Sequence, residues 1–286
     1  MDGTAGTGGH SEEIVKRLGP GGRLICLDRD ADAVRLSRER LSTFGERVTV
    51  MRGNFSDLKE ILADQRQGEV DGVLLDLGIS TLQIEHSGRG FSFTRDEPLD
   101  MRMDQDERLT AGGLVDRLSV QELEEILRRY GEERKAKRIA SLVKKASGSG
   151  AALSSLDLAR LVEKAVPRSN RPGAKNPATR TFQALRIAVN RELENLEKFL
   201  ESSPSCVRKG GRLAVLTYHS LEDRIVKQTM VRWERGCTCP PRLPRCMCGN
   251  HPTFRRVNRK GIRPTEAEIQ ENPRSRSATL RAAERV

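Results

Sequence analysis

A glycine-rich segment opens the chain and leads directly into a stretch with helical periodicity. It reads Asp2-Gly-Thr-Ala-Gly-Thr-Gly-Gly-His-Ser11. Glycines let the backbone approach a bound molecule closely, and the free N–H groups at a helix N-terminus attract polar ligands. The Gly-x-Gly-x-x-Gly dinucleotide fingerprint is broken, because Ser11 occupies the third glycine position counted from Gly6. Taken alone, the loop is a weak indication of a nucleotide-type ligand.

Three more side chains of suitable chemistry follow short apolar runs. Asp28 ends a run about 20 residues after the loop, Phe55 follows the next run, and Asp76 ends the one after it. A carboxylate at Asp28 can accept hydrogen bonds from both hydroxyls of a ribose, and the ring of Phe55 can lie against an adenine. Each could instead be an ordinary turn or core residue. Together with the loop they predict an adenosine-bearing ligand in a crevice at one edge of a sheet.

The same loop narrows the choice of adenosine ligand. It contains no lysine and no Walker pattern, which disfavours ATP. The broken fingerprint and the leading Asp2 favour S-adenosylmethionine over NAD, because the methionine end of that cofactor carries an amino group and no phosphate.

The elements that must position these residues form an alternating series. Strands are expected at residues 23–27, 47–51, 70–75 and 211–217, with helices at 11–18, 31–41 and 57–65 and another from 220 to 233. Short buried runs alternating with amphipathic helices predict a mostly parallel α/β sheet covered on both faces. The tail after Gly236 is rich in Pro, Arg and Gly, and we expect it to be irregular.

A long stretch between the third and fourth runs has helical periodicity only. Its helices are expected at 119–130, 132–146, 154–166 and 177–200. On the last of these, an acid-free polar stripe of Thr179, Gln183, Arg186 and Asn190 is either a nucleic-acid contact or the border of a helix core. We therefore predict a discontinuous catalytic domain, residues 1–108 and 204–286, with an inserted helical domain at 109–203.

Positive charge is concentrated in blocks. The chain has 51 Lys+Arg and 40 Asp+Glu, a net charge of +11, and a pI near 9.7. The stretch from residue 224 to 286 carries 15 basic and 5 acidic residues, and the stretches 134–145 and 168–191 each carry six basic residues and no acid. Basic blocks are typical of proteins with a polyanionic partner, most often nucleic acid. The alternative is a solvated surface.

Other functional classes are excluded by composition. No apolar run approaches the roughly 18 residues of a membrane-spanning helix, and no signal peptide opens the chain. Six cysteines in 286 residues are too few for a secreted disulfide scaffold. We expect a cytoplasmic protein without a membrane partner, and no protein partner is identifiable.

Eight motifs together closely resemble the MraW/RsmH-type methyltransferase family. They lie in one order over nearly the whole chain: Asp2-Gly-Thr-x-Gly-x-Gly-Gly-His-Ser11, Leu75-Asp-Leu-Gly-Ile-Ser80, Arg89-Gly-Phe-Ser-Phe93, Pro98-Leu-Asp-Met-Arg-Met-Asp104, Tyr130-Gly-Glu-Glu-Arg134, Asn176-Pro-Ala-Thr-Arg-Thr-Phe-Gln183, His219-Ser-Leu-Glu-Asp-Arg224 and Asn272-Pro-Arg-Ser-Arg-Ser277.

The resemblance implies an S-adenosylmethionine-dependent enzyme that methylates the N4 amine of a cytidine in the decoding region of 16S rRNA, in the small ribosomal subunit. It also implies a Rossmann-like methyltransferase domain with a helical insertion. Transferred position by position, the cofactor contacts of the family fall on Gly8, Gly9, His10, Asp28, Phe55, Asp76 and Gln83. Leu82 stands where the family has proline before that glutamine, which puts the local turn in doubt.

Two residues are candidates for catalysis. Asp76 and the backbone carbonyls after it can accept hydrogen bonds from a cytosine amine and hold it in line with a sulfonium methyl group. Many amino-methyltransferases have a Pro-Pro-aromatic segment at this place, whereas this chain has Leu77-Gly78-Ile79. The second candidate is His219, as proton acceptor or base contact, although a single histidine is more often structural.

Four cysteines in two Cys-x-Cys pairs, Cys237/Cys239 and Cys246/Cys248, have spacing that could surround one tetrahedral zinc ion. The alternative is four reduced thiols. Because the resemblance implies no required metal, we assign no metal ligand.

A parallel α/β domain needs a strand that leads into the glycine-rich loop, and only Met1 precedes Asp2 here. We expect the first strand to be missing, through a misassigned start or because the chain is a fragment. If the chain is complete, poor stability and weak cofactor binding should follow.

Three alternative functions remain at this point. The first is a non-catalytic RNA-binding or ribosome-assembly protein on the same fold. The second is an NAD-dependent oxidoreductase, which the broken fingerprint disfavours. The third is a DNA methyltransferase, against which only the family resemblance argues.

Overall fold

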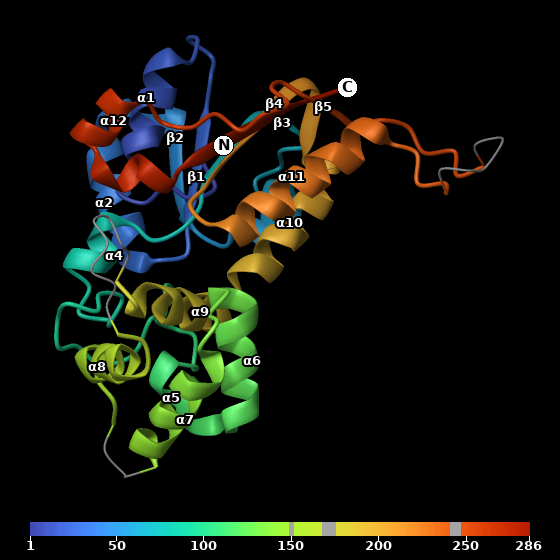
Figure 1. Cartoon of the computed structure of the whole chain (residues 1–286). Helices are drawn as coiled ribbons and strands as arrows, with labels where there is room; N and C mark the ends of the chain where they lie inside the picture. The colour runs from blue at the N-terminus through green and yellow to red at the C-terminus, as the bar shows by residue number, and fades with distance from the viewer. Residues whose placement is uncertain (149–151, 168–175, 241–246) are drawn as a thin grey trace. The chain divides into compact units, whose positions relative to one another are not determined.

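The computed structural model describes residues 1–148, 152–167, 176–240 and 247–286 (Figure 1). The chain divides into two compact units. The sheet unit comprises Met1–Gly78 and Leu193–Val286, and the helical unit comprises Ile79–Glu192. The second unit thus interrupts the first along the chain.

Among its described residues, the sheet unit has six strands. They are β1 (Leu24–Asp28), β2 (Val48–Arg52), β3 (Val70–Asp76), β4 (Val207–Thr217), β5 (Phe254–Arg256) and β6 (Thr279–Arg285). The β1/β2 and β3/β4 pairs are parallel, as predicted. The β4/β6 and β5/β6 pairs are antiparallel, so the α/β fold has a mixed sheet. The prediction of an irregular tail was wrong at β5 and β6, where Phe254 and Ala283 become fully buried against the core.

The first residues of the chain lie between β1 and β3. Asp2 N donates to Ile25 O at 2.8 Å, and Leu27 N donates to Asp2 O at 2.8 Å. On the other side, Gly3 N donates to Leu74 O at 2.9 Å. Met1–Gly3 therefore occupies the sheet position from which a strand would lead into the glycine-rich loop.

Helices flank these strands in the sheet unit. They are α1 (Gly9–Arg17), α2 (Ala31–Leu41), α3 (Leu58–Asp64), α10 (Glu192–Cys206), α11 (Ser220–Arg235) and α12 (Glu266–Glu271), with short 3-10 turns at Ser42–Arg47, Phe55–Asp57 and Pro273–Ser277. One core joins α3, α10 and α11 to β3 and β4, and includes Leu62, Phe199, Val215 and Met230. A smaller core joins α1 and α2 to β1.

The helical unit contains α4 (Thr81–Glu85), α5 (Ala111–Arg117), α6 (Val120–Gly131), α7 (Ala136–Ser147), α8 (Ser155–Ala165) and α9 (Ala178–Asn190). Its described residues form a single hydrophobic core and no strand beyond one isolated bridge, Pro98 with Ser154. In the part of the chain that the structure describes, no helix is long and apolar enough to cross a membrane.

The unit boundaries lie earlier in the chain than the predicted 108/109 and 203/204. The segment before α5 belongs to the helical unit because Phe91, Leu99 and Met101 pack in its core. On the other side, Leu196 and Phe199 of α10 pack in the core of the sheet unit. Apolar side chains in loops carry no periodicity, so the sequence pattern could not show which core they join.

One predicted helix, 177–200, is instead two. α9 ends at Asn190, and Arg191 has a left-handed backbone (φ 50°) before α10 begins. The polar stripe predicted on this helix serves the helical unit itself. Asn190 accepts from Met103 N and donates to Met101 O, both at 2.8 Å, while Arg186 pairs with Glu192 at 2.7 Å.

Candidate active site

The backbone of the glycine-rich loop approaches its neighbours more closely than a side chain allows. A Cβ atom on Gly3 would lie 2.4 Å from Leu75 Cδ2, so a larger residue here would force the buried Leu75 side chain to shift. Gly6 and Gly8 have positive φ, 54° and 84°, which favours glycine at both turns. A Cβ at Gly6 would meet nothing within 4 Å, so the turn borders open space. The loop then enters α1, whose N-cap is Gly8.

Asp2 stabilises this loop through hydrogen bonds from within it. Its side chain is completely buried. Oδ2 accepts from Ser11 Oγ at 2.6 Å, and Oδ1 accepts from Thr4 N at 3.1 Å. Burial raises the pKa of Asp2 above its ordinary value. The carboxylate is therefore used inside the loop, which removes the argument that it selects the amino group of a cofactor.

Asp28, the last residue of β1, connects the strand end to the loop. Its Oδ2 accepts from Gly6 N at 2.8 Å, and its Oδ1 accepts from Asp30 N at 2.9 Å. Burial raises the pKa of Asp28 to about 6. An ionised carboxylate has about four acceptor positions, so two remain after these bonds. That capacity suits the two hydroxyls of a ribose.

Asp76, the last residue of β3, is the centre of a second polar cluster. Its backbone N donates to Thr4 Oγ1 at 2.6 Å, which ties it to the loop. Its Oδ1 accepts from the Tyr218 hydroxyl at 2.8 Å, and its Oδ2 lies 3.4 Å from His10 Nε2. The hydrogen bond to Asp76 raises the pKa of His10. Burial, followed by the charge of Asp76, raises the pKa of Tyr218. The carboxylate is thereby fixed as a hydrogen-bond acceptor at the carboxyl edge of the sheet.

Tyr218 is the residue of this cluster that sequence reasoning missed. It comes directly after β4, which runs parallel to β3 with Leu216 opposite Asp76. A residue just beyond that register must lie at the same sheet edge, and this signal could have found it. The ring also lies against the backbone of Gly78, where a Cβ would be 3.5 Å from Tyr218 Cδ2.

The family of the chain follows from comparison with known proteins. The sequence matches the MraW methylase family over residues 1–286. The chain belongs to that family.

Curated relatives match this methylase over its full length. Each is named "Ribosomal RNA small subunit methyltransferase H". The protein of Desulfosudis oleivorans is 52% identical over 100% of this chain and 92% of its own length. That of Symbiobacterium thermophilum is 49% identical over 99% of this chain and 89% of its own length. That of Syntrophotalea carbinolica is 48% identical over 100% and 91%.

His219, the second predicted catalytic residue of the methylase, begins a helix. It is the N-cap of α11, and its Nδ1 accepts from Glu222 N at 3.4 Å. Its Nε2 lies 3.1 Å from Glu222 Oε1, and only 10% of its side chain is exposed. These contacts give the imidazole a role in starting α11, whereas its neighbour Tyr218 reaches Asp76. A catalytic role for His219 stays a prediction.

The remaining predicted cofactor contacts lie in different places. Gly8 and Gly9 form the entry to α1, and Phe55 packs edge-on against Phe199 with ring centroids 5.7 Å apart. Gln83 belongs to the helical unit, where it is buried and closes a capping box with Ser80 at the start of α4. The turn that the Leu82 departure put in doubt is therefore a regular helix start.

The helical unit of the methylase carries a basic groove. A cavity of about 550 Å³ is lined by Arg128, Arg134, Lys135, Lys137, Arg138, Ser141, Leu142 and Lys164. This lining contains six cations and no acid, and it includes four of the six basic residues of the first predicted block. Residues 168–175 of the second predicted block lie outside the described residues.

Of the four predicted zinc thiols, the structure brings three together. The Sγ atoms of Cys237, Cys239 and Cys248 all lie within 4.8 Å of one another. Cys246 lies outside the described residues.

Proposed function

We propose that this methylase transfers a methyl group from S-adenosylmethionine to the N4 amine of a cytidine in the decoding region of 16S rRNA. The observation that carries the proposal is the Asp76 cluster at the carboxyl edge of the sheet, in a chain that matches the MraW methylase family from end to end. The names of the relatives support the small-subunit rRNA as the substrate class.

S-adenosylmethionine is the cofactor that the site residues suit. The open turn at Gly6 and the two unfilled acceptor positions of Asp28 fit an adenosine moiety. Of the predicted cofactor contacts, those in the sheet unit would hold the cofactor: Gly8, Gly9, His10, Asp28, Phe55 and Asp76. When bound, it supplies an electrophilic methyl group on a sulfonium.

Asp76 and the carbonyl groups that follow it would bind the cytosine amine. The lone pair of that amine is delocalised into the ring, so N4 is a weak nucleophile. Hydrogen bonds accepted by the carboxylate localise electron density on N4 and hold it in line for attack. Tyr218 donates to Oδ1, and His10 lies at Oδ2, so both keep the carboxylate in place. The bound cofactor would supply the methyl group to N4, and Asp76, which accepts the hydrogen bond from the amine, would take up the proton that N4 releases.

The basic groove of the helical unit would contact the phosphate backbone of the RNA. Its lining cations are exposed, and the acid that pairs with one of them, Glu124 with Arg128, lies outside the lining. Exposed lysines and arginines bind phosphates and release counterions, which gives affinity without sequence selection.

The test incubates the full-length chain with methyl-labelled S-adenosylmethionine and small ribosomal subunits that lack the modification. The labelled nucleotide is then mapped. Label on the N4 amine of one decoding-region cytidine supports the proposal, and label elsewhere in the rRNA contradicts the assigned nucleotide. Free 16S rRNA in a parallel reaction distinguishes naked RNA from the assembled subunit as substrate.

The alternative function is a non-catalytic RNA-binding or assembly protein on the same fold. It accounts for the basic groove but leaves the Asp28 and Asp76 clusters without use. Equilibrium binding of S-adenosylmethionine separates the two, because an assembly protein need not bind the cofactor. RNA binding without cofactor binding would favour the alternative.

A further inference from the structure

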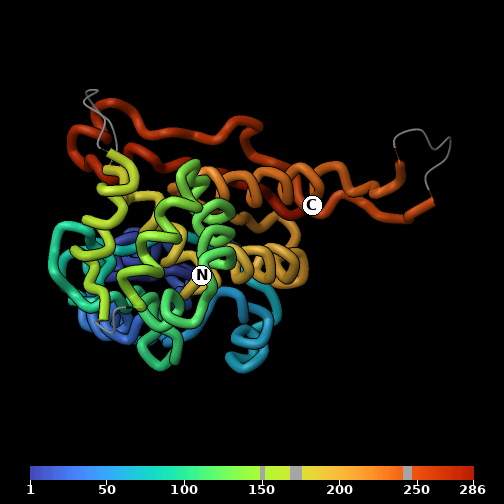
Figure 2. Tube along the Cα trace, turned by 60° about the horizontal axis from the view of Figure 1, so that its bottom comes forward, coloured from blue at the N-terminus to red at the C-terminus, as the bar shows by residue number. Residues whose placement is uncertain are grey.

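A two-legged arm leaves the sheet unit after α11 and returns to β5. We define the cysteine arm as residues 236–240 and 247–252, its described parts, and call each of these two segments a leg (Figure 2). Its two legs meet at the base, where a Cβ on Gly236 would lie 2.4 Å from both His251 C and Pro252 N. Farther out, Asn250 Nδ2 donates to Thr238 Oγ1 at 3.0 Å. The legs therefore run beside each other.

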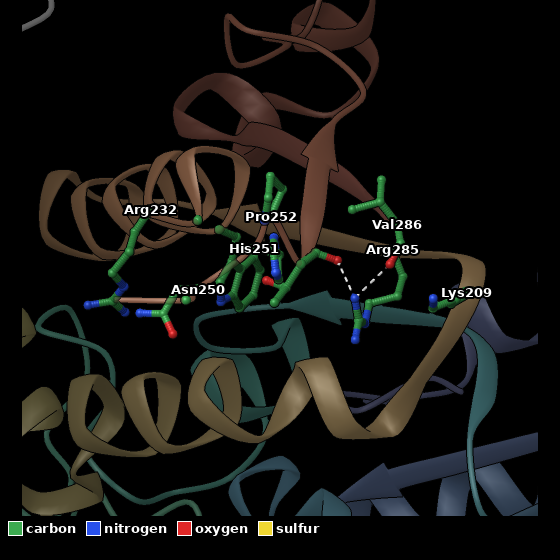
Figure 3. A pocket seen from close by; sticks show the side chains of 11 residues that line it. Lys209, Arg232, Asn250, His251, Pro252, Arg285 and Val286 are labelled. Carbon is green, nitrogen blue, oxygen red and sulfur yellow. Dashed lines mark hydrogen bonds between the residues drawn. The ribbon is translucent and has the colours of Figure 1, made fainter. Parts of the chain in front are cut away.

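The base of the arm is anchored in the sheet unit (Figure 3). Thr253 N donates to Trp233 O at 3.0 Å, and Arg285 donates to the carbonyls of Thr253 and Val286 at 2.7 and 2.8 Å. Trp233 in turn stacks on Phe254, with ring centroids 4.6 Å apart. Both ends of the arm are therefore held by hydrogen bonds and ring packing in the sheet unit.

The arm itself has no hydrophobic core among its described residues. None of these residues is buried, and Met247 is 83% exposed. A segment that buries so little apolar surface needs another source of order, such as a disulfide or a metal ion.

The thiols of the arm converge instead. Cys237 and Cys239 come from one leg and Cys248 from the other, and the Cys237 and Cys248 Sγ atoms are 3.8 Å apart. Two backbone groups donate to these sulfurs, Thr238 N to Cys248 Sγ at 3.4 Å and Met247 N to Cys239 Sγ at 3.3 Å. Hydrogen bonds of this kind orient the ligand atoms of a metal site.

We propose that Cys237, Cys239 and Cys248 bind a Zn²⁺ ion that joins the two legs of the cysteine arm. Zinc–sulfur bonds of about 2.3 Å at tetrahedral angles place two sulfurs about 3.8 Å apart, the separation seen between Cys237 and Cys248. A disulfide would need about 2.05 Å. Each thiol loses its proton on binding, and another donor completes the tetrahedron.

The test measures the metal content of the full-length chain without an affinity tag, produced in zinc-supplemented medium and purified without chelator. Elemental analysis for zinc and iron should give about one zinc per chain and no iron. The double variant Cys237→Ser/Cys239→Ser and the single variant Cys248→Ser should each lose nearly all of the bound zinc. Cys206→Ala, which removes a buried thiol of the sheet-unit core, is the matched control and should keep its zinc.

A second measurement needs no variant. Replacing the bound ion with Co²⁺ in the wild-type chain should give the intense visible absorption of tetrahedral cobalt with thiolate ligands. Three results would overturn the proposal: wild-type chain without zinc from the supplemented preparation, iron in place of zinc, or zinc retained by the cysteine variants. These readouts are independent of methyl transfer, so they can fail while the proposed function stands.

Discussion

The carboxyl edge of the sheet and the basic groove of the helical unit use charge in opposite ways. At the sheet edge, Asp28 and Asp76 are each held by at least two short contacts and are partly withdrawn from water. In the groove, Lys135, Lys137 and Arg138 are exposed on the surface of α7 and at its start. The sheet edge holds individual carboxylate oxygens in fixed positions, whereas the groove presents a diffuse positive electrostatic potential.

This difference determines how each region should respond to substitution. A carboxylate in a preorganised site contributes to turnover through one fixed hydrogen-bond acceptor, which no neighbouring residue can replace. Exposed cations contribute jointly to the attraction of RNA phosphates, and salt screens that attraction. We therefore expect large effects on turnover from single substitutions at the sheet edge, and moderate, salt-dependent effects on RNA affinity from the groove.

The largest effect is expected from Asp76→Ala. Turnover should fall about 10³-fold, because the acceptor that aligns the amine is lost. Single-turnover methylation of small subunits measures this, and thermal unfolding checks that the variant remains folded. Asp71→Ala is the matched control on the same strand, where the side chain is 81% exposed. Near-normal turnover of Asp76→Ala would remove this residue from the mechanism.

Asp28→Asn should weaken cofactor binding about tenfold at pH 8, because hydrogen bonds to a charged group contribute about 1.5 kcal/mol or more. The raised pKa of Asp28, about 6, also predicts a pH dependence. Protonation below pH 6 removes acceptor capacity, so wild-type affinity should fall as the pH is lowered through that value. The ratio of variant to wild-type Kd should therefore shrink at low pH.

Titration calorimetry with S-adenosylmethionine between pH 8 and pH 5 measures this ratio. Asp32→Asn, which alters a half-exposed carboxylate in the first turn of α2, should bind like the wild type. A ratio that is constant with pH would show that ionised Asp28 does not accept from the cofactor.

Reversing two charges in the groove tests the other side of the comparison. Lys135→Glu/Arg138→Glu should raise the KM for small subunits about tenfold and flatten its salt dependence, while kcat at saturation is unchanged. Lys59→Glu/Lys227→Glu, which reverses two exposed lysines of the sheet unit, is the charge-matched control. An unchanged KM, or a loss confined to kcat, would exclude the groove as a phosphate-binding surface.

The smallest effect is expected from Tyr218→Phe, which removes only the hydrogen bond to Asp76. A bond of about 1 kcal/mol predicts a roughly fivefold lower kcat with unchanged KM and cofactor Kd, as expected of a positioning residue. Tyr130→Phe, at the other tyrosine of the chain, should have no effect. If cofactor affinity falls instead, Tyr218 contacts the cofactor side of the site.

Much of this protein could be predicted from local sequence. The runs that became β1 to β4 are short and apolar, and each is bounded by turn residues, so their type and place follow from side-chain pattern alone. Asp28 and Asp76 lie at the ends of two such runs, and parallel strands bring such ends to one edge. Family membership followed from long motifs, because a motif of many residues in fixed order does not arise by chance.

The tertiary structure alone decided the partners of these residues. Asp2 was predicted to favour a ligand amine, yet burial turns it toward Ser11 and Thr4. Tyr218, and not His219, reaches Asp76, because the register of β4 against β3 fixes which side chain lies at the shared edge. Strand β6 and the convergence of three thiols also depend on pairing between distant segments. Such contacts join residues far apart in the chain, so no local pattern encodes them.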